Sequence, residues 1–168
     1  MTTTRARRAR WWTLIVGLVL AIVATATIGG WQAVKGRELD NAASAAARQT
    51  VLDTARSTVI KLLSYKPDTV EADLNAATSL LTGNFRESYG KLIHDVVIPG
   101  AKQKNITAVA QVPAAAVESL TTDKASMIVF VNQQATVGTD APTTTTTTVR
   151  VGLQKINGAW LIDAFDPI

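Results

Sequence analysis

Few side chains in this sequence could carry acid–base or metal chemistry. His94 is the sole histidine and cysteine is absent, which excludes thiol nucleophiles, thiolate-ligated zinc, iron–sulfur clusters and histidine-rich metal cages. Asp95 directly follows His94, and adjacent residues on a helix do not face each other. His94 with a distant aspartate would give a general base, as in some cone-shaped hydratases and isomerases, but a surface or packed histidine is the favoured interpretation. No catalytic residue is assigned.

The carboxylates do not predict a metal site, and the glycines do not predict a nucleotide-binding loop. Asp68, Glu71 and Asp73 lie close together, but they lack the ligand spacing and the glycine of an EF-hand loop. Acidic residues in the first turn of a helix are the simpler explanation. Neither a Walker A sequence nor GxGxxG occurs, so we expect no metal, no cofactor and no enzymatic activity.

The aromatic residues after the first apolar segment suggest a core and, as an alternative, a pocket. All of them are predicted to face the interior, and ordinary packing is the favoured explanation. If the interior is incompletely filled, the same side chains would line an apolar pocket suited to a lipid tail. The candidate pocket residues are Tyr65, Phe85, Tyr89, Phe130 and Trp160, with Phe165 as a further core aromatic.

The net charge of +4 describes a short tail and not the folded part. Arg5, Arg7, Arg8 and Arg10 account for all of it, because the remaining Lys and Arg residues equal the Asp and Glu residues in number. A nucleic-acid-binding domain carries a basic face on its folded part. We therefore expect no nucleic-acid partner.

A long apolar segment follows the arginines and predicts a membrane anchor. Trp11 to Trp31 contains no charged residue, and as a helix it would be roughly 31 Å long, enough to cross a hydrocarbon core of about 30 Å. Tryptophans at both ends suit the two membrane interfaces. The predicted anchor residues are Trp11, Trp12, Leu14, Ile15, Val16, Leu18, Leu20, Ile22, Ile28 and Trp31.

Charge on either side of this segment predicts its orientation. Residues 1–10 are basic, whereas Lys35 and Arg37 are offset by Glu38 and Asp40, so the positive-inside rule places the N-terminus in the cytoplasm. Residues after 31 would then be extracytoplasmic, on a single-pass protein of the cell (inner) membrane. A cleavable signal peptide ending in the small residues 24–26 is the main alternative.

Helical patterns occupy the first half of the exported part. Residues 32–65 are predicted to form a connecting first helix, and residues 66–168 the remainder of the exported α+β domain. Pro67 disfavours helical geometry at Lys66, so the first helix should end there. A second helix is predicted from Asp68 or Thr69 to Gly83-Asn84, and a third from Asn84 to Pro99-Gly100. The apolar faces are predicted to be Leu52, Ala55, Val59, Leu62 and Leu63, then Val70, Leu74, Ala77 and Leu81, then Phe85, Tyr89, Leu92 and Val96.

Strand patterns follow from about residue 105, where apolar residues alternate and β-branched residues become frequent. Asn157-Gly158 predicts a two-residue type I′ hairpin turn. Thr143 to Thr148 is predicted to extend a hairpin strand, with a flexible or glycosylated tip as the alternative. Met127 to Val131 is apolar on both faces, so this strand should be central and either covered on both faces, or covered on one face and lining a cavity with the other. The strand candidates are Ile106–Val112, Ala114–Ser119, Ala125–Val137, Val149–Ile156 and Ala159–Phe165.

Together these elements predict an α+β fold with three helices packed on one face of a curved antiparallel sheet. Motifs spread along residues 11–168 support a family resemblance. They are Ser64-Tyr65, Ala76 to Leu80, Thr82-Gly83-Asn84-Phe85, Tyr89, Pro99, Asn157 to Ile162 and Asp166-Pro167. In this order, behind one apolar anchor, they make the chain similar to the actinobacterial Mce-associated membrane proteins.

The resemblance implies an exported NTF2-like cone with a non-catalytic, accessory role. Such a protein would stabilise or regulate an Mce-type lipid or sterol importer in the cell envelope, with the bilayer and transporter subunits as partners. The family has no catalytic residues to transfer. An extracytoplasmic lipid carrier and, less favoured, an NTF2-like enzyme are the alternatives. A homodimer through the open sheet face is plausible by analogy with this architecture.

Overall fold

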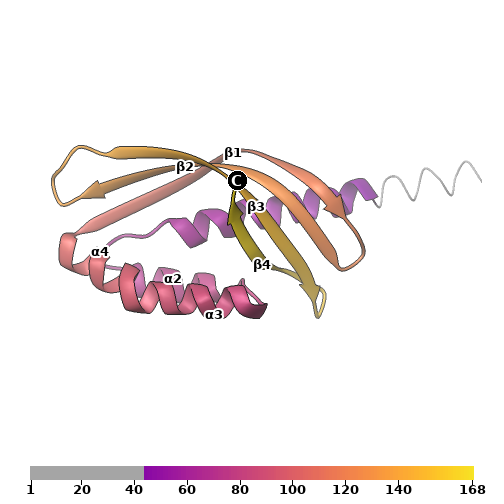
Figure 1. Ribbon diagram of the computed structural model, residues 1–168, viewed down its shortest axis with the longest axis horizontal. Coiled ribbons are helices and arrows are strands. Elements are labelled where there is room, and N and C mark those ends of the chain that lie inside the picture. Colours follow the sequence, from indigo (N-terminus) through magenta and orange to yellow (C-terminus); the bar gives the residue numbers. More distant parts are fainter. Residues whose placement is uncertain (1–43) are drawn as a thin grey trace, which may run out of the picture. The chain divides into compact units, whose positions relative to one another are not determined.

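The computed structural model describes residues 44–168 (Figure 1). Helices come first along the chain and strands follow. The helical elements are a first helix over residues 44–63, α2 (Val70–Thr78), α3 (Gly83–Leu92), a π-helical segment η1 (Ile93–Val97) and α4 (Ile98–Lys104). The strands are β1 (Ile106–Leu120), β2 (Lys124–Val137), β3 (Thr143–Ile156) and β4 (Ala159–Pro167). The predicted α+β class, with helices covering an antiparallel sheet, is confirmed.

The first two helices keep their predicted apolar faces. Ala55, Val59 and Leu62 of the first helix are buried, as are Val70 and Leu74 of α2. The first helix ends before Pro67, as the proline requires. However, α2 is shorter than predicted, because it ends at Thr78 and the chain then turns into the sheet instead of continuing to Gly83-Asn84.

The third predicted helix does not end at Pro99-Gly100, and that prediction was wrong. The chain widens into the π-helical segment η1 and continues as α4, whose N-terminal turn contains Pro99. Proline has no N–H and its ring crowds the carbonyl four residues earlier, so a wider turn just before it lets the helix continue. The helix ends instead at Asn105, which is left-handed at φ 53°.

The buried face of this helix also differs from the prediction. Tyr89 is buried and Ile93 follows it on the inside, whereas Leu92 and Val96 are 52% and 59% exposed. Spacings of three and four residues are both compatible with one helical face. The sequence pattern predicted that Leu92 is buried, but the structure buries its neighbour Ile93 instead.

The sheet contains four strands in the order β1-β2-β3-β4, all antiparallel, where five strand candidates were predicted. The two candidates on either side of Pro113 are one continuous strand, β1. Its pairing with β2 shifts register between Gln111 and Ala114, so Pro113 lies in the irregular stretch. Proline within strands is tolerated at edges and bulges, and β1 is an edge strand with such a bulge.

The hairpin predictions are confirmed. Thr143 to Thr148 extends β3, with Thr143 paired to Ala135 at the far end of β2. Asn157 and Gly158 have φ values of 50° and 86°, the positive values that a type I′ turn needs. The long central strand β2 lies between β1 and β3, as its apolar sequence predicted.

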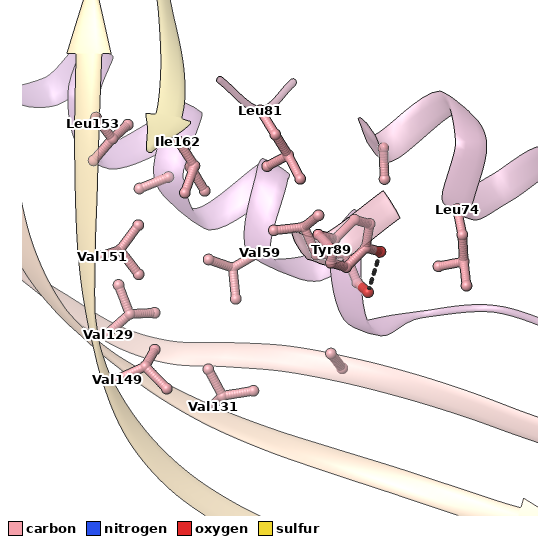
Figure 2. Packing of buried hydrophobic residues seen from close by; sticks show 14 of the residues in the cluster. Val59, Leu74, Leu81, Tyr89, Val129, Val131, Val149, Val151, Leu153 and Ile162 are labelled. Carbon is pink, nitrogen blue, oxygen red and sulfur yellow. Dashed lines mark hydrogen bonds between the residues drawn. The ribbon is translucent and has the colours of Figure 1, made fainter. Parts of the chain in front are cut away.

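One hydrophobic core lies between the helices and the sheet. Figure 2 shows Val129, Val149 and Val151 of the sheet opposite Val59 and Leu81 of the helical side. All five side chains are essentially inaccessible to solvent. Helices and sheet therefore share a single core and depend on each other for burial.

The predicted membrane segment lies outside the described residues, so the anchor and its orientation stay predictions. In the stretch from 44 to 168, none of the helices has both the length and the apolar character needed to cross a bilayer. The compact unit comprises Ala47–Ile168.

Candidate docking groove

An open groove lies where the first helix, the following connection, α2 and the start of β1 meet. It encloses about 840 Å³. Most of its lining is apolar, and two lysines lie among the residues that surround it. The lining residues are Ile60, Lys61, Ser64, Tyr65, Lys66, Thr69, Ala72, Asp73, Ala76, Ala77, Ser79, Leu80, Ala108 and Val109.

Small side chains on α2 create the hollow. Ala72 and Ala76 are exposed and lie one helical turn apart, on a different face from Val70 and Leu74, which enter the core. Their methyl groups leave open space that a longer side chain would fill. The groove exists because α2 presents a second, small-residue surface next to its buried one.

Two larger apolar side chains remain uncovered at the groove. Ile60 of the first helix is 37% exposed and Val109 of β1 is 45% exposed. Covering exposed aliphatic surface with a ligand or partner lowers the free energy by about 25 cal/mol for each Å² removed from water. Ile60 and Val109 are therefore suited to contact an apolar surface.

Charged groups around the groove are predominantly positive. Lys61 and Lys66 contribute two positive charges, and Asp73 contributes one negative charge. The Thr69 hydroxyl donates a hydrogen bond to the Asp73 carboxylate at 2.6 Å, which partly occupies the acceptor capacity of that carboxylate. An occupant with apolar surface and some negative charge would complement this lining.

Hydrogen bonds hold the end of the first helix, which forms one wall. The last carbonyls of a helix have no partner within the helix. Here the Tyr89 hydroxyl donates to the Leu62 carbonyl at 2.9 Å, the bond drawn in Figure 2, and Gln133 Nε2 donates to the Leu63 carbonyl at 2.8 Å. The groove wall is thus fixed by α3 and β2.

Tyr65 joins the groove to the sheet. Its backbone N–H and carbonyl both bond to Ala108 of β1 at 2.9 Å. Partial burial raises the pKa of the Tyr65 hydroxyl, so it stays protonated at neutral pH. No hydrogen-bond partner for this hydroxyl occurs within residues 44–168, which leaves it able to bond an occupant.

The structure does not gather the five predicted pocket residues around one cavity. Tyr65 alone lines the groove. Phe85 stacks on Phe165 with ring centroids 6.1 Å apart and also contacts Tyr89, whose centroid is 6.0 Å away. Trp160 packs at the margin of the core, with Lys155 Nζ 5.7 Å from its ring centroid.

The expectation that Phe130 faces the core was wrong. Phe130 is 43% exposed, whereas its neighbours Val129 and Val131 are buried. Side chains alternate between the two faces of a strand, so only one face of the apolar run from Met127 can enter the core. Helices cover that face alone.

His94 and the acidic residues form no reactive cluster. His94 is exposed on η1, near an ion pair in which Lys102 Nζ lies 2.7 Å from Glu71 Oε2. The hydrogen bond and charge of Lys102 lower the pKa of Glu71, with a smaller contribution from His94. In the part of the chain that the structure describes, His, Asp and Glu nowhere form a group of three able to hold a metal.

Apart from Tyr65, the groove residues were not identified as a candidate site from the sequence. The spacing of Ala72 and Ala76 was the available signal, since it marks a small-residue face on an otherwise amphipathic helix. No sequence signal marked Ile60 or Val109, because the sequence does not distinguish an exposed aliphatic residue from a buried one.

Comparison with proteins of known sequence gives a consistent set of relatives. "Outer membrane protein Rv1973" of Mycobacterium tuberculosis strain H37Rv is 50% identical over 155 residues, covering 92% of this chain and 94% of that protein. "Uncharacterized protein Rv1362c" of the same strain is 34% identical over 152 residues, covering 90% of this chain and 69% of that protein.

Solved structures share the fold at low sequence identity. An IcmL-like type IV secretion system protein of Legionella pneumophila has a TM-score of 0.61 at 11% identity, covering 73% of this chain and 92% of that one. The VirB8 protein of Agrobacterium tumefaciens has a TM-score of 0.57 at 13% identity, covering 71% and 90%. The periplasmic domain of DotI has a TM-score of 0.59 at 15% identity, covering 70% and 92%. At these identities the likeness concerns the fold alone.

A family model gives the assignment at the level of sequence. The model described as "Uncharacterized protein Rv1363c/MT1408-like" matches residues 12–159, most of the chain. Two mycobacterial relatives above 30% identity agree with it over at least nine-tenths of the chain. The chain therefore belongs to the Rv1363c/MT1408-like family.

Proposed function

We propose that this chain is a non-catalytic accessory protein of the cell envelope that docks onto an Mce-type lipid or sterol import complex. Residues 11–31 hold it in the inner membrane with its N-terminus in the cytoplasm. The folded part lies outside, and the groove between the first helix, α2 and β1 receives a transporter subunit. The groove is the observation that carries this proposal.

The groove has the composition of a protein-docking surface. Ile60 and Val109 offer uncovered aliphatic surface, and Lys61 and Lys66 add positive charge. Interfaces combine an apolar centre with a polar rim in this way. Membrane tethering would raise the effective concentration of both partners, so a modest groove would suffice for binding.

The relatives and structural neighbours support an envelope location. One relative is named as an outer membrane protein, and the DotI structure is described as a periplasmic domain. The Mce-type partner rests on the resemblance carried by motifs such as Thr82-Gly83-Asn84-Phe85 and Asn157 to Ile162.

The test is capture of importer subunits by the tagged full-length chain from native membranes. Ala76→Glu places a longer charged side chain in the groove, and glutamate is a good helix former, so α2 should remain intact. Asn75→Glu makes the same charge change on the exposed surface of α2 outside the groove and is the matched control. We expect Ala76→Glu to reduce capture about tenfold, the effect of roughly 1.4 kcal/mol, and Asn75→Glu to retain it.

Two results would overturn the proposal. One is a wild-type chain that captures no Mce-type subunit. The other is equal capture by the Ala76→Glu and Asn75→Glu proteins, which would separate the groove from docking. A mature N-terminus at Thr27, or a cytosolic reporter at the C-terminal end, would refute the anchored topology.

A lipid carrier is the second candidate, favoured by one observation. The groove has an apolar lining next to Lys61 and Lys66, which suits an acyl chain with an anionic head. Labelling of the full-length chain by a photoactivatable fatty acid tests it. If Ala76→Glu abolishes labelling while importer capture persists, the groove binds lipid and docking occurs elsewhere.

A further inference from the structure

The outer face of the sheet is the face turned away from the helices. Val129 and Val131 of β2 are buried in the core that the sheet shares with the helices, so the residues that alternate with them point outward. In Figure 1, α2, α3 and α4 lie on one side of the sheet. No element of residues 44–168 covers the other side, where Phe130 is 43% exposed. A ligand can therefore reach this face.

A small hollow opens on the outer face where β1, β2 and β3 run side by side, and it encloses about 230 Å³. Gln134 of β2 lies opposite Val109 of β1 and Thr144 of β3, and Asn132 lies opposite Gln111 farther along the same face. These five residues line the hollow. The antiparallel pairing thus gathers the side-chain amides of Gln111, Asn132 and Gln134, here called the amide cluster, on one surface.

The amide cluster has hydrogen-bonding groups to offer. A side-chain amide carries one acceptor oxygen and two N–H donors. The Thr146 hydroxyl donates to Asn132 Oδ1 at 2.9 Å, which leaves the Asn132 N–H groups available. Within residues 44–168, no side-chain hydrogen bond engages Gln111 or Gln134. The cluster therefore presents donors and acceptors side by side.

Phe130 adds an exposed aromatic ring beside the amide cluster. It precedes Asn132 by two residues on the same face of β2, roughly 7 Å along the strand. Its neighbours across the sheet are Ala114 of β1 and Thr148 of β3, whose small side chains leave the ring accessible. An aromatic ring and polar amides therefore adjoin each other on one open surface.

The residues that line the hollow carry no charge. Arg150 and Glu118 lie farther along the outer face and form an ion pair, with Arg150 Nε 3.2 Å from Glu118 Oε2. Phosphates and other anions are commonly bound by Arg or Lys side chains. Such a ligand would find no cation among the residues of the hollow, so the lining favours a neutral ligand.

We infer that the outer face of the sheet binds a neutral carbohydrate chain. The C–H groups of one sugar ring pack on Phe130, because the face of an aromatic ring is negative. Hydroxyls of the next ring bond the amide cluster, since hydroxyls and amides both donate and accept hydrogen bonds. From Phe130 to Gln134 the strand extends roughly 13 Å, which exceeds the width of one sugar ring and suits a chain.

A protein partner matches this surface less well. Protein interfaces have an apolar core surrounded by a polar rim, whereas here the hollow is lined mainly by polar side chains and the aromatic ring lies beside it. The hollow is also smaller than the roughly 300–1,000 Å³ of sites that enclose a drug-sized molecule. A short stretch of a longer glycan is the class of ligand that fits both observations.

Binding of neutral hexasaccharides to the full-length chain tests the inference. The chain is placed in nanodiscs of phosphatidylcholine, because this lipid carries no sugar whereas many detergents do. The probes are hexasaccharides of glucose, mannose, galactose, arabinose or N-acetylglucosamine, each titrated separately by calorimetry. We expect at least one of them to bind, with the same affinity at low and high salt, because a neutral ligand has no charge to screen.

Two substitutions at Phe130 separate stacking on a ring from general apolar contact. Phe130→Tyr keeps an aromatic ring, whereas Phe130→Leu keeps an apolar side chain without a ring. Both lie at an exposed position, so the fold should persist. We expect Phe130→Leu to weaken binding of the hexasaccharide about tenfold and Phe130→Tyr to remain within about twofold of wild type.

Two glutamine substitutions test the amide cluster. Gln134→Leu removes an amide from the hollow and keeps a side chain of similar size. Gln154→Leu makes the same change on the outer face of β3, opposite Lys124 and outside the hollow, and is the matched control. We expect Gln134→Leu to weaken binding about fivefold, the effect of one lost hydrogen bond, and Gln154→Leu to leave it unchanged.

Any of three results would overturn the inference. One is a wild-type chain that binds none of the hexasaccharides, or binds them only at low salt. Another is equal binding by Phe130→Leu and Phe130→Tyr, and the third is equal binding by Gln134→Leu and Gln154→Leu. Loss of importer capture in Phe130→Leu, without glycan binding by wild type, would assign the face to a protein partner instead.

The carbohydrate site and the proposed docking function can fail separately. Ala76→Glu alters the groove and should bind the hexasaccharide as wild type does, whereas Gln134→Leu should retain capture of importer subunits. Weaker glycan binding by Ala76→Glu than by Gln134→Leu would contradict a site on the outer face.

Discussion

Tyr89 shows how a single buried polar group fixes neighbouring elements. Its ring lies in the core, while its hydroxyl donates to the Leu62 carbonyl at the end of the first helix. Burial and, to a smaller extent, the nearby Tyr65 raise its pKa well above the ordinary value of 10.0. The neutral hydroxyl is thus favoured in the folded protein, where it also donates the hydrogen bond.

Tyr89→Phe is expected to lower the free energy of unfolding by about 1–2 kcal/mol, since it leaves a buried carbonyl without a partner. A raised pKa contributes stability that is present below about pH 10 and is lost as pH rises further. Urea unfolding at pH 8 to 11 should therefore show a steeper decline for wild type than for Tyr89→Phe. Parallel declines would contradict the assignment.

Gly152 lies where the neighbouring strand β4 approaches closely, so an added side chain would force its neighbours to shift. A Cβ at this position would lie 2.6 Å from Asp163 Oδ1 and 3.1 Å from the Ala164 Cβ. The pairing of β3 with β4 shifts register beside Gly152, and Asp163 is the extra residue on β4. The glycine therefore accommodates the bulge.

Gly152→Ala is expected to destabilise the protein by about 1–3 kcal/mol, as for overpacking. Gly90→Ala is the control, because nothing lies within 4 Å of its added methyl group and it is within α3. That control should stabilise the helix by up to about 1 kcal/mol. Chemical denaturation of both variants measures the difference, and equal effects would contradict the steric explanation.

At the scale of elements, the connections between helices also form isolated bridges to the edge strands β1 and β4. Ser64 and Tyr65 cover β1, and Leu80 to Thr82 covers β4. Each connection contributes backbone hydrogen bonds and keeps a helix against the sheet. Removing one of these bonds should therefore loosen the edge locally before it affects the whole domain.

Ser64→Ala is expected to increase amide hydrogen exchange at Ala110, whose N–H loses its acceptor. The cost in stability should be about 1–2 kcal/mol. Ser57→Ala is the control, because the exposed Ser57 hydroxyl bonds only the Thr54 carbonyl within its own helix. Unchanged exchange at Ala110 would show that water replaces the serine without loss.

Element types followed from periodicity, but element ends did not. The apolar run from Met127 to Val131 predicted the central strand β2. The Asn157-Gly158 pair predicted the turn between β3 and β4, because few other residues accept positive φ. The prolines led to wrong element ends, because a helix end was predicted at Pro99 and a break between two strands at Pro113. Pro99 was accommodated by a π-helical turn and Pro113 by an edge bulge, and both solutions depend on neighbouring elements.

At the scale of the whole molecule, the helices and the sheet should unfold together. Ile162 lies in the shared core, and its backbone bonds the connection after α2. Ile162→Ala is expected to cost about 2–5 kcal/mol. Leu92→Ala removes an exposed side chain and should change stability by about 0.5 kcal/mol or less.

Circular dichroism measures this prediction at wavelengths dominated by helix and by strand. Both signals should follow one transition, shifted equally by Ile162→Ala, since small single domains unfold cooperatively. Separate transitions would indicate that the sheet is stable without the helices.

The sequence by itself determined the fold class, the buried faces of the first two helices, the central strand and the hairpin turns. These depend on local periodicity and backbone preference, which each segment carries on its own. Only the tertiary structure decided the groove and the exposure of Phe130. Those features depend on which face another element covers, and such packing relations involve residues far apart in the chain.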